Sequence, residues 1–500
     1  MRVLMWHGWL LEGSGSNVYT ARVTEILRRE GHDVLLLCQQ ADAEGFAFID
    51  ASGTASVEGV SELAPTGAAP ARGRAVLLRP RIELLPVFVD EYSELPIKRF
   101  VDLSFEELET YIARNTDALA AAAEWHGSQA VMVGHAVAGP AIARRALGPG
   151  GYVAKLHGSD LEYAVRLQDR YLELAREGLE GARAVVGTSD DVIERAVSLI
   201  PTIAGRMVKI APGVDVDRFR LMPRREALEG LAAALSTDPE IARGRPASLD
   251  AQVRAAVERR DAAALEALPR RYDQTVPDPD AHARVRALAG YDGALLGYFG
   301  KLIVQKGVER LIEATARSSD RAHAMVIGFG LFREWLEALV TAFDADESAL
   351  EWLRDASGMQ LERLVRVPGL TERVTFTGRL DHRYAPAALA ALDVQVVPST
   401  LEEAFGMVAA EGAAAGALPL VARHSGLAEV ASALETEVGR SGLFSFEPGD
   451  GATGRVEAGI QTILALPDAE RAELREAISR YVGREWTWDH TAQRLLETAK

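Results

Sequence analysis

The chain has 500 residues, one cysteine and a formal net charge of −17, from 55 basic and 72 acidic residues. The acidic excess disfavours a nucleic-acid binder, which needs a basic face, and one cysteine excludes an internal disulfide framework or a cysteine-based zinc cluster. At roughly 150 residues per domain, the length predicts two or three domains. No apolar run reaches the ~18 residues that cross a bilayer, and the first apolar stretch is too short for a signal peptide. We therefore expect a cytoplasmic protein without membrane association.

The first part of the chain alternates between strand and helix patterns. An apolar strand is predicted over residues 2–6, a glycine loop over 13–16, a helix over 18–29 that Gly31 closes, and a second strand over 32–37. Further strands are predicted over 129–133, 152–156, 183–186 and 208–211, with helices over 140–147 and from about 160. Near-continuous apolar strands separated by helices indicate a parallel sheet covered on both faces.

A divergent stretch separates the second and third of these strands. Residues 41–73 are rich in Ala, Gly and Ser and predict loops with short edge structure. Ser104 with Glu107 forms a capping-box pattern that predicts the start of a helix.

A second alternating half begins near Tyr291. Its predicted strands cover residues 294–299, 324–327, 374–376, 394–397 and 418–422. The halves are joined by residues 221–289, which are rich in Ala and Arg and punctuated by Pro269, Pro277 and Pro279. We interpret this segment as a helical insertion that ends in an extended linker. A solvated appendage, an oligomer contact and a lid over a cleft remain open as its role.

Two loops that follow strands carry candidate anion-binding residues. Gly13 and Gly15 lie between a strand and a helix, where glycine permits close backbone approach and helix N–H groups favour a phosphate; a plain tight turn is equally compatible. Lys301 and Lys306 follow the strand over 294–299 and precede a helix over 308–316. Two point charges at this crossover suggest a diphosphate clamp, although loop lysines are more often only solvated.

The segment over residues 398–412 is the most specific. A strand ends at Pro398, a helix is predicted from about Phe405, and Glu411 lies eight positions after Glu403. Glu403 would then stand at the helix entrance, with Glu411 about two turns inside. An acid inside an Ala-rich helix is not needed for solubility. The alternative is that Glu403 caps the helix and Glu411 is exposed.

Taken together, these residues resemble a retaining nucleotide-sugar glycosyltransferase with the GT-B fold, of glycosyltransferase family 4. Glu403 and Glu411 fit that family's E-x7-E motif, and Lys301 and Lys306 fit its diphosphate pair. Further segments fall in family order: residues 13–15, 157–160, 211–215, 328–330, 378–380, 425–429, 447–450 and 488–490. The chain departs from the pattern with Lys301 in place of the usual arginine, with Pro212 for Asn, and with the insertion.

The resemblance implies an α/β fold of two Rossmann-like doubly wound domains that face each other across a cleft. It implies an N-terminal acceptor-side domain over residues 1–220, the insertion over 221–289, a nucleotide-sugar domain over 290–470, and a final helical piece over 471–500 that packs back on the first domain. The acceptor would lie mainly on the divergent stretch 41–124.

The resemblance also implies roles for single residues. Lys301 and Lys306 would neutralise the leaving diphosphate, Glu403 would hold donor-sugar hydroxyls, Glu411 would bind the ribose, and His157 would lie near the sugar. The remaining implied donor contacts are Gly13, Gly15, Gly378, Leu380, Phe405, Gly406, Met407 and Val408. His135 and Ser16 are weaker acceptor candidates. Retention would follow from front-face displacement without a metal or other cofactor, because fixed charges stabilise the departing group.

Other patterns receive structural interpretations. The Asp215 and Asp217 pair resembles a metal motif but stands at a turn, and His7 is assigned to packing. His382 is a candidate for the nucleobase side. We expect a nucleotide-sugar donor, with UDP chosen on family frequency alone, and a soluble small-molecule or glycan acceptor. The alternatives are a sugar phosphorylase, a nucleotide-sugar epimerase, or a non-catalytic nucleotide-sugar-binding protein.

Overall fold

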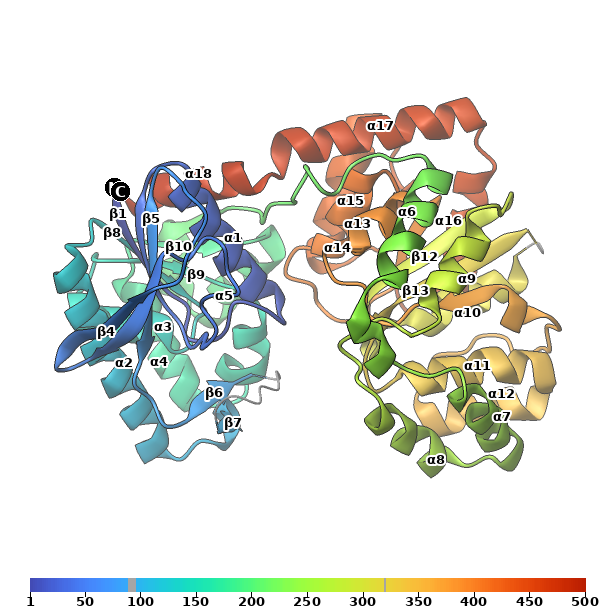
Figure 1. Cartoon of the computed structure of the whole chain (residues 1–500), viewed down its shortest axis with the longest axis horizontal. Helices are drawn as coiled ribbons and strands as arrows, with labels where there is room; N and C mark the ends of the chain where they lie inside the picture. The colour runs from blue at the N-terminus through green and yellow to red at the C-terminus, as the bar shows by residue number, and fades with distance from the viewer. Residues whose placement is uncertain (89–95, 319–320) are drawn as a thin grey trace. The chain divides into compact units, whose positions relative to one another are not determined.

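The computed structural model describes residues 1–88, 96–318 and 321–500, so residues 89–95 of the divergent stretch lie outside the described part. The described chain divides into two compact units. Unit 1 comprises residues 1–213 and 486–500, and unit 2 comprises residues 214–485. Each unit is built around one mainly parallel sheet with helices on both faces (Figure 1).

Unit 1 contains, in its described residues, a nine-stranded sheet in the order β11-β10-β9-β8-β1-β2-β5-β3-β4. Its strands are β1 (Arg2–Trp6), β2 (Asp33–Leu37), β3 (Ala51–Ser56), β4 (Gly59–Pro65), β5 (Arg74–Pro80), β8 (Ala130–Gly134), β9 (Val153–Lys155), β10 (Ala184–Gly187) and β11 (Met207–Lys209). β6 (Leu85–Val87) and β7 (Ile97–Arg99) form a separate pair. The helices are α1 (Gly15–Arg29), α2 (Phe105–His126), α3 (Gly139–Leu147), α4 (Asp169–Gly181), α5 (Asp190–Leu199) and α18 (Trp488–Ala499).

The sequence patterns that predicted unit 1 have clear local causes. β2 is apolar throughout its buried part because helices cover both faces of the sheet. Ser104 and Glu107 form the predicted reciprocal capping box at the start of α2. The stretch 41–73 contains more structure than expected, because β3 pairs in parallel with β5 and turns back into antiparallel β4. The small residues of β3 hide its strand pattern.

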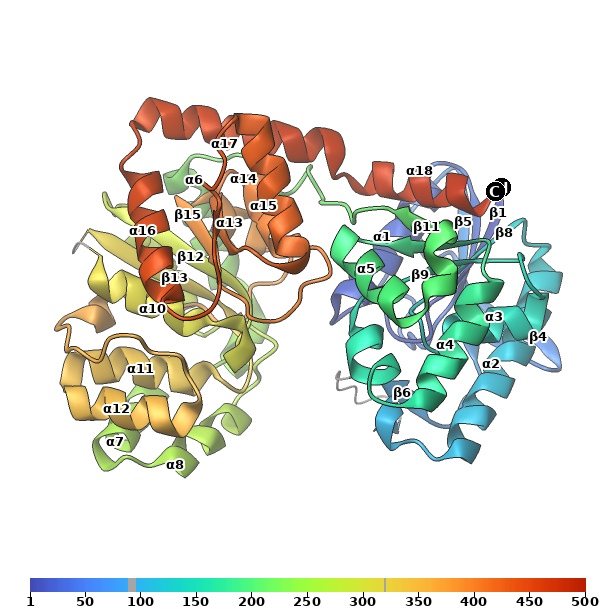
Figure 2. The same ribbon diagram turned by 180° about the vertical axis from the view of Figure 1, so that it is seen from behind.

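Unit 2 contains, in its described residues, a six-stranded parallel sheet in the order β14-β13-β12-β15-β16-β17. Its strands are β12 (Ala294–Lys301), β13 (Ala322–Phe329), β14 (Val374–Phe376), β15 (Val394–Val397), β16 (Leu418–Ala422) and β17 (Ser445–Phe446). The helices are α6 (Arg224–Ser236), α7 (Leu249–Arg259), α8 (Ala262–Ala267), α9 (Ala281–Leu288), α10 (Val308–Arg317), α11 (Arg333–Ala345), α12 (Glu347–Ser357), α13 (Ala385–Ala390), α14 (Met407–Ala415), α15 (Ser425–Val438), α16 (Ala452–Leu464) and α17 (Asp468–Glu485). Figure 2 shows α10 beside α16, and α17 alongside α14 and α15.

The inserted segment is part of unit 2 and not a solvated appendage. α6 packs on α9 and α13, and α7 packs on α11. Their apolar positions, such as Leu231 and Val253, are buried. The predicted extended linker is also short, because α9 begins at Ala281.

The C-terminal segment is shared by the two units. α17 buries Leu474, Ile478 and Val482 and packs on α14 and α15, so residues 471–485 belong to unit 2. α18 packs on α1 of unit 1, where the Trp488 ring lies edge-on to Tyr19 with centroids 5.5 Å apart. No helix in the described residues is long and apolar enough to cross a membrane.

Candidate functional site

The candidate donor residues of unit 2 lie where the strand order reverses. The chain runs from β12 outward to β13 and β14, then returns to β15 on the other side of β12. In open parallel sheets, ligands bind at such a point, outside the carboxyl ends of the strands. Lys301 is the last residue of β12, and Pro398 directly follows β15.

Lys306 and Glu403 meet at this edge. The Lys306 ammonium donates to Glu403 Oε1, and about a fifth of each side chain is exposed. The two loops are tied together, since Thr400 N donates to Gln305 O at 2.7 Å. Position 307, next to these loops, needs a glycine, because its φ is +64° and a Cβ there would lie 2.4 Å from Pro398 O. The sequence-predicted lysine and glutamate therefore form one charged cluster within reach of a ligand.

Glu403 does not cap the helix that follows it. The cap position of α14 is Gly406, in a left-handed conformation, without a side-chain cap. The backbone N–H of Glu403 donates instead to Ser425 Oγ at 2.9 Å, which fixes the loop. The Glu403 carboxylate is thus turned to Lys306, and the N-terminal N–H groups of α14 around Met407 and Val408 receive no capping side chain. The capping alternative is wrong.

Glu411 is buried, in contrast to the exposed alternative. Only 5% of the residue is exposed, and its Oε1 lies 3.2 Å from His382 Nε2. The His382 ring also lies edge-on to Phe219, with centroids 5.7 Å apart. His382 follows the loop 378–380, so the structure joins Glu411 to the segment that the sequence placed on the nucleobase side. A carboxylate held by an imidazole is a suitable acceptor for ribose hydroxyls.

The remaining predicted donor residues of unit 2 differ in how far they are exposed. Lys301 is exposed at the end of β12. Leu380 and Phe405 are buried, with 2% and 6% of each residue exposed. Gly378 has a φ of +75° and follows β14 closely.

Unit 1 places Gly13, Gly15 and Ser16 at the start of α1. Ser14 caps this helix by accepting from Asn17 N, and its Oγ lies 3.1 Å from Ser16 Oγ. A Cβ at Gly13 or Gly15 would meet no atom within 4 Å. The loop therefore has space beside its backbone, which suits both the phosphate interpretation and a simple turn.

Three histidines, of which His7 and His135 are buried and His157 is half-buried, gather at the carboxyl ends of neighbouring strands in unit 1. His7 follows β1, His135 follows β8 and His157 follows β9. The rings of His135 and His157 have centroids 4.5 Å apart, and those of His7 and His135 lie 6.0 Å apart. Burial lowers the pKa of all three and brings that of His7 to about 4. Neutral imidazoles both donate and accept hydrogen bonds, so this cluster suits hydroxyl groups.

His135 is the least satisfied member of the cluster. Its φ is +67°, and neither ring nitrogen has a hydrogen-bond partner in the described residues. Its Nδ1 lies 3.8 Å from Asp160 Oδ2, beyond a hydrogen bond.

The sequence interpretation missed His7 and Lys155. Lys155 ends β9; its Nζ donates to Leu156 O at 2.5 Å and lies 4.9 Å from the centroid of the Tyr19 ring. Burial lowers the pKa of Lys155 to about 7, partly offset by Asp160. A signal was present: a histidine lies one or two residues after each of three strands that a parallel sheet could place side by side. The described residues form no group of three or more His, Cys, Asp or Glu that could hold a metal.

The two parallel sheets and the carboxyl-edge cluster define a GT-B architecture. Residues 285–481 match the family model described as "Glycosyl transferases group 1". Sucrose-phosphate synthase from Thermosynechococcus elongatus has the same fold, with a TM-score of 0.59, 18% identity, and coverage of 99% of this chain and 97% of that chain. HepE from Anabaena, solved with UDP and glucose, has a TM-score of 0.58 and 16% identity over 99% and 98% of the two chains. The resemblance to GT-B glycosyltransferases is confirmed.

Curated relatives match over a shorter region. A GDP-mannose-dependent alpha-(1-6)-phosphatidylinositol dimannoside mannosyltransferase from Mycobacterium tuberculosis is 28% identical over 211 residues, 41% of this chain and 43% of the relative. A 2-deoxystreptamine glucosyltransferase from Streptomyces kanamyceticus is 26% identical over 200 residues, 39% and 41% of the two chains. The matched region thus spans less than half the length of these relatives.

Proposed function

We propose that the protein is a retaining glycosyltransferase that moves a sugar from a nucleotide-sugar donor to an acceptor by metal-independent front-face displacement. The observation that carries the proposal is the Lys306–Glu403 ion pair at the strand-order reversal of unit 2, followed in the chain by the buried Glu411 of α14. The match of residues 285–481 to a glycosyltransferase family supports it.

The proposed roles follow from charge and position. Lys306, with Lys301, neutralises the diphosphate as it departs, and a fixed cation aimed at developing charge is a large catalytic term. Glu403 orients the ammonium of Lys306 and accepts from donor-sugar hydroxyls, and Glu411 accepts from the ribose. In unit 1, His157 contacts the donor sugar, and His135 with Ser16 contacts the acceptor.

The donor base is proposed as uracil. HepE was solved with UDP, whereas one curated relative is named for GDP-mannose, so a panel of UDP-, GDP- and ADP-sugars is the direct comparison. A soluble acceptor, a cytoplasmic location and membership of glycosyltransferase family 4 stay predictions from the sequence.

Substitution of the ion pair tests the proposal. We expect Lys306→Ala and Glu403→Gln each to lower transferase kcat/KM by about 10²–10³-fold, the usual cost of removing one transition-state-stabilising group. Glu402→Gln, at the exposed neighbouring position, is the matched control and should stay close to wild type. The anomeric configuration of the product, read by NMR, tests retention, and activity after chelation tests metal independence.

Two results would reject the assignment. Full activity of both ion-pair variants would show that the site is elsewhere. Donor consumption at the same rate with and without any acceptor would favour an epimerase, which needs no second sugar.

A further inference from the structure

A small pocket in unit 2 is lined by the inserted segment together with the carboxyl edge of the sheet. Tyr272, Gln274 and Val276 come from the insertion, residues 328–330 follow β13, and Gly378 follows β14. Its empty volume is about 180 Å³, partly open to solvent. Because this volume includes open solvent, the pocket is a shallow recess that the edge or face of one ring of a larger ligand can contact.

The pocket lies along the same sheet edge as the candidate diphosphate residues. Phe329, in its wall, is the register partner of Lys301 across the β12–β13 pair. β14 lies two strands from β12, about 10 Å at the usual strand spacing. A nucleotide with its phosphates at Lys301 and Lys306 would therefore extend its other end toward this pocket.

The insertion reaches the pocket by pairing with the sheet. Pro277 forms an antiparallel bridge with Gly378, and Asp278 N donates to Thr377 O at 2.9 Å. A Cβ at Gly378 would lie 2.6 Å from Asp278 Oδ1, so glycine is needed for this close approach. Residues 272–278 thereby form a wall over the ends of β13 and β14.

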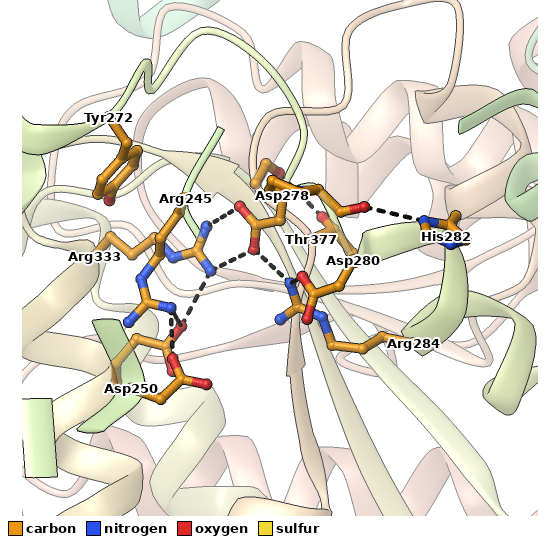
Figure 3. Close-up of polar contacts among 12 residues, drawn as sticks. Arg245, Asp250, Tyr272, Asp278, Asp280, His282, Arg284, Arg333 and Thr377 are labelled. Atoms are coloured by element: carbon orange, nitrogen blue, oxygen red, sulfur yellow. Dashed lines mark hydrogen bonds and ion pairs between the residues drawn. The ribbon is translucent and has the colours of Figure 1, made fainter. Parts of the chain in front are cut away.

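A buried ion network fixes that wall (Figure 3). Both oxygens of Asp278 accept from Arg333 at 2.7 Å, and Arg284 adds a third bond at 2.7 Å. Arg245 binds Glu334 at 2.9 and 3.0 Å, and Tyr272 Oη donates to the same carboxylate at 2.9 Å. The carboxylates of Asp278 and Glu334 are occupied by these bonds, so the network positions the wall.

Gln274 offers the pocket a hydrogen-bond acceptor that the occupied carboxylates of the network do not. Its side chain is half-buried in the pocket wall, and its Nε2 donates to Pro269 O at 2.9 Å. Within the described residues, nothing donates to its amide oxygen. That oxygen can accept from a ring or exocyclic N–H of a nucleobase, while Val276 and Phe329 supply apolar contact.

We propose that residues 272–278 of the insertion form a wall of the nucleobase subsite, and that Gln274 determines which base is preferred. This inference rests on the proposed function, because it requires a nucleotide donor. It assigns the insertion to donor selectivity and not to oligomerisation. Gln274 reads the base, and the Asp278–Arg333 pair positions the segment that carries it.

Calorimetric titration of the full chain with UDP, GDP, ADP and inorganic pyrophosphate tests the proposal. Gln274→Ala should weaken the preferred nucleoside diphosphate about tenfold, the effect of one hydrogen bond, and shrink the difference among the three bases. Pyrophosphate should bind as in wild type. Gln252→Ala, an exposed glutamine of α7 in the same insertion, is the matched control and should change none of the four.

The outcomes separate this inference from the proposed function. Unchanged affinities and ranking in a folded Gln274→Ala protein would overturn the inference alone, and Lys306→Ala should still weaken all four ligands. A wild-type chain that binds no nucleoside diphosphate would overturn both. If melting shows that Gln274→Ala does not fold, Gln274→Met keeps the side-chain length without polar atoms and must give the same loss of preference.

Discussion

Two clusters of buried ionisable groups, one in each unit, differ in how burial affects their charge. In unit 2, Asp278 and Arg333 are paired at 2.7 Å and stay charged. Burial alone would raise the pKa of Asp278, but the charges of Arg333 and Arg284 outweigh it and hold that pKa below its usual value. In unit 1, burial instead drives His135, His157 and Lys155 toward their neutral forms.

This difference separates scaffolding from binding capacity. The carboxylates of the unit 2 network are occupied by its guanidinium groups, so the main effect of the network is to hold one backbone arrangement. Neutral groups with unfilled hydrogen-bonding positions, such as His135, keep the capacity to bind a ligand. We therefore expect substitutions in the network of unit 2 to alter mainly stability, and those in the cluster of unit 1 to alter stability in a pH-dependent way.

The largest expected effect comes from breaking the Asp278–Arg333 pair. Asp278→Ala leaves a buried guanidinium without its main counter-ion, which costs about 3–5 kcal/mol of unfolding free energy. Chemical denaturation measures the loss. Glu229→Ala, which removes the exposed Arg225–Glu229 pair, is the control and should change stability by less than about 0.5 kcal/mol. A loss below about 1 kcal/mol for Asp278→Ala would mean that the network does not hold the insertion.

A smaller, pH-dependent effect is expected at Lys155. Its pKa is about 7 in the folded chain against 10.5 for a free lysine, so between these values the unfolded chain binds a proton that the folded chain does not. The free energy of unfolding therefore falls as pH is lowered from 10.5 to 7, by at most about 1.4 kcal/mol per pH unit. Between pH 9 and pH 7 this amounts to roughly 2–3 kcal/mol.

Lys155→Met removes this titration and should flatten the profile. Denaturation at pH 7 and pH 9 would then show a higher stability of the variant relative to wild type at pH 7 than at pH 9. Lys209→Met, at an exposed lysine of the same unit, should keep the wild-type slope. A Lys155→Met profile as steep as that of wild type would show that Lys155 is charged throughout this range.

Much of unit 2 was predictable because its strands and several site residues can be recognised from their immediate neighbours in the sequence. The five predicted strands are largely apolar runs, and Lys306 and Glu403 lie in loops between a strand end and a helix start, which the chain pattern marks. Even there, the burial of Glu411 depends on the packing of α14, and its contact with His382 depends on a loop 29 residues away. The sequence analysis gave Glu411 and His382 separate ligand roles and did not predict their contact.

The residues that were not predicted depend on distant contacts. Lys155 stands in an apolar strand pattern that does not show which way its side chain points. His7 can be recognised as part of a cluster only once the fold brings it close to His135, 128 residues later. Residues 272–278 were interpreted as part of a linker, because their pairing partner Gly378 is about 100 residues away. Glycine and proline in the sequence indicate irregular backbone, but they do not show which distant segment pairs with it.

The smallest effect is expected at Tyr272, where the network meets the pocket. Tyr272→Phe removes one hydrogen bond to Glu334 and keeps the ring in the pocket wall, so we expect a loss of about 1 kcal/mol in unfolding free energy. Glu334 keeps its two bonds to Arg245, and the wall should stay in place. Donor affinity should therefore match that of wild type. If Tyr272→Phe weakened nucleotide binding as much as Gln274→Ala, the Tyr272 hydroxyl group would take part in base recognition. The network could then no longer be described as only positioning the wall, with Gln274 as the residue that recognises the base.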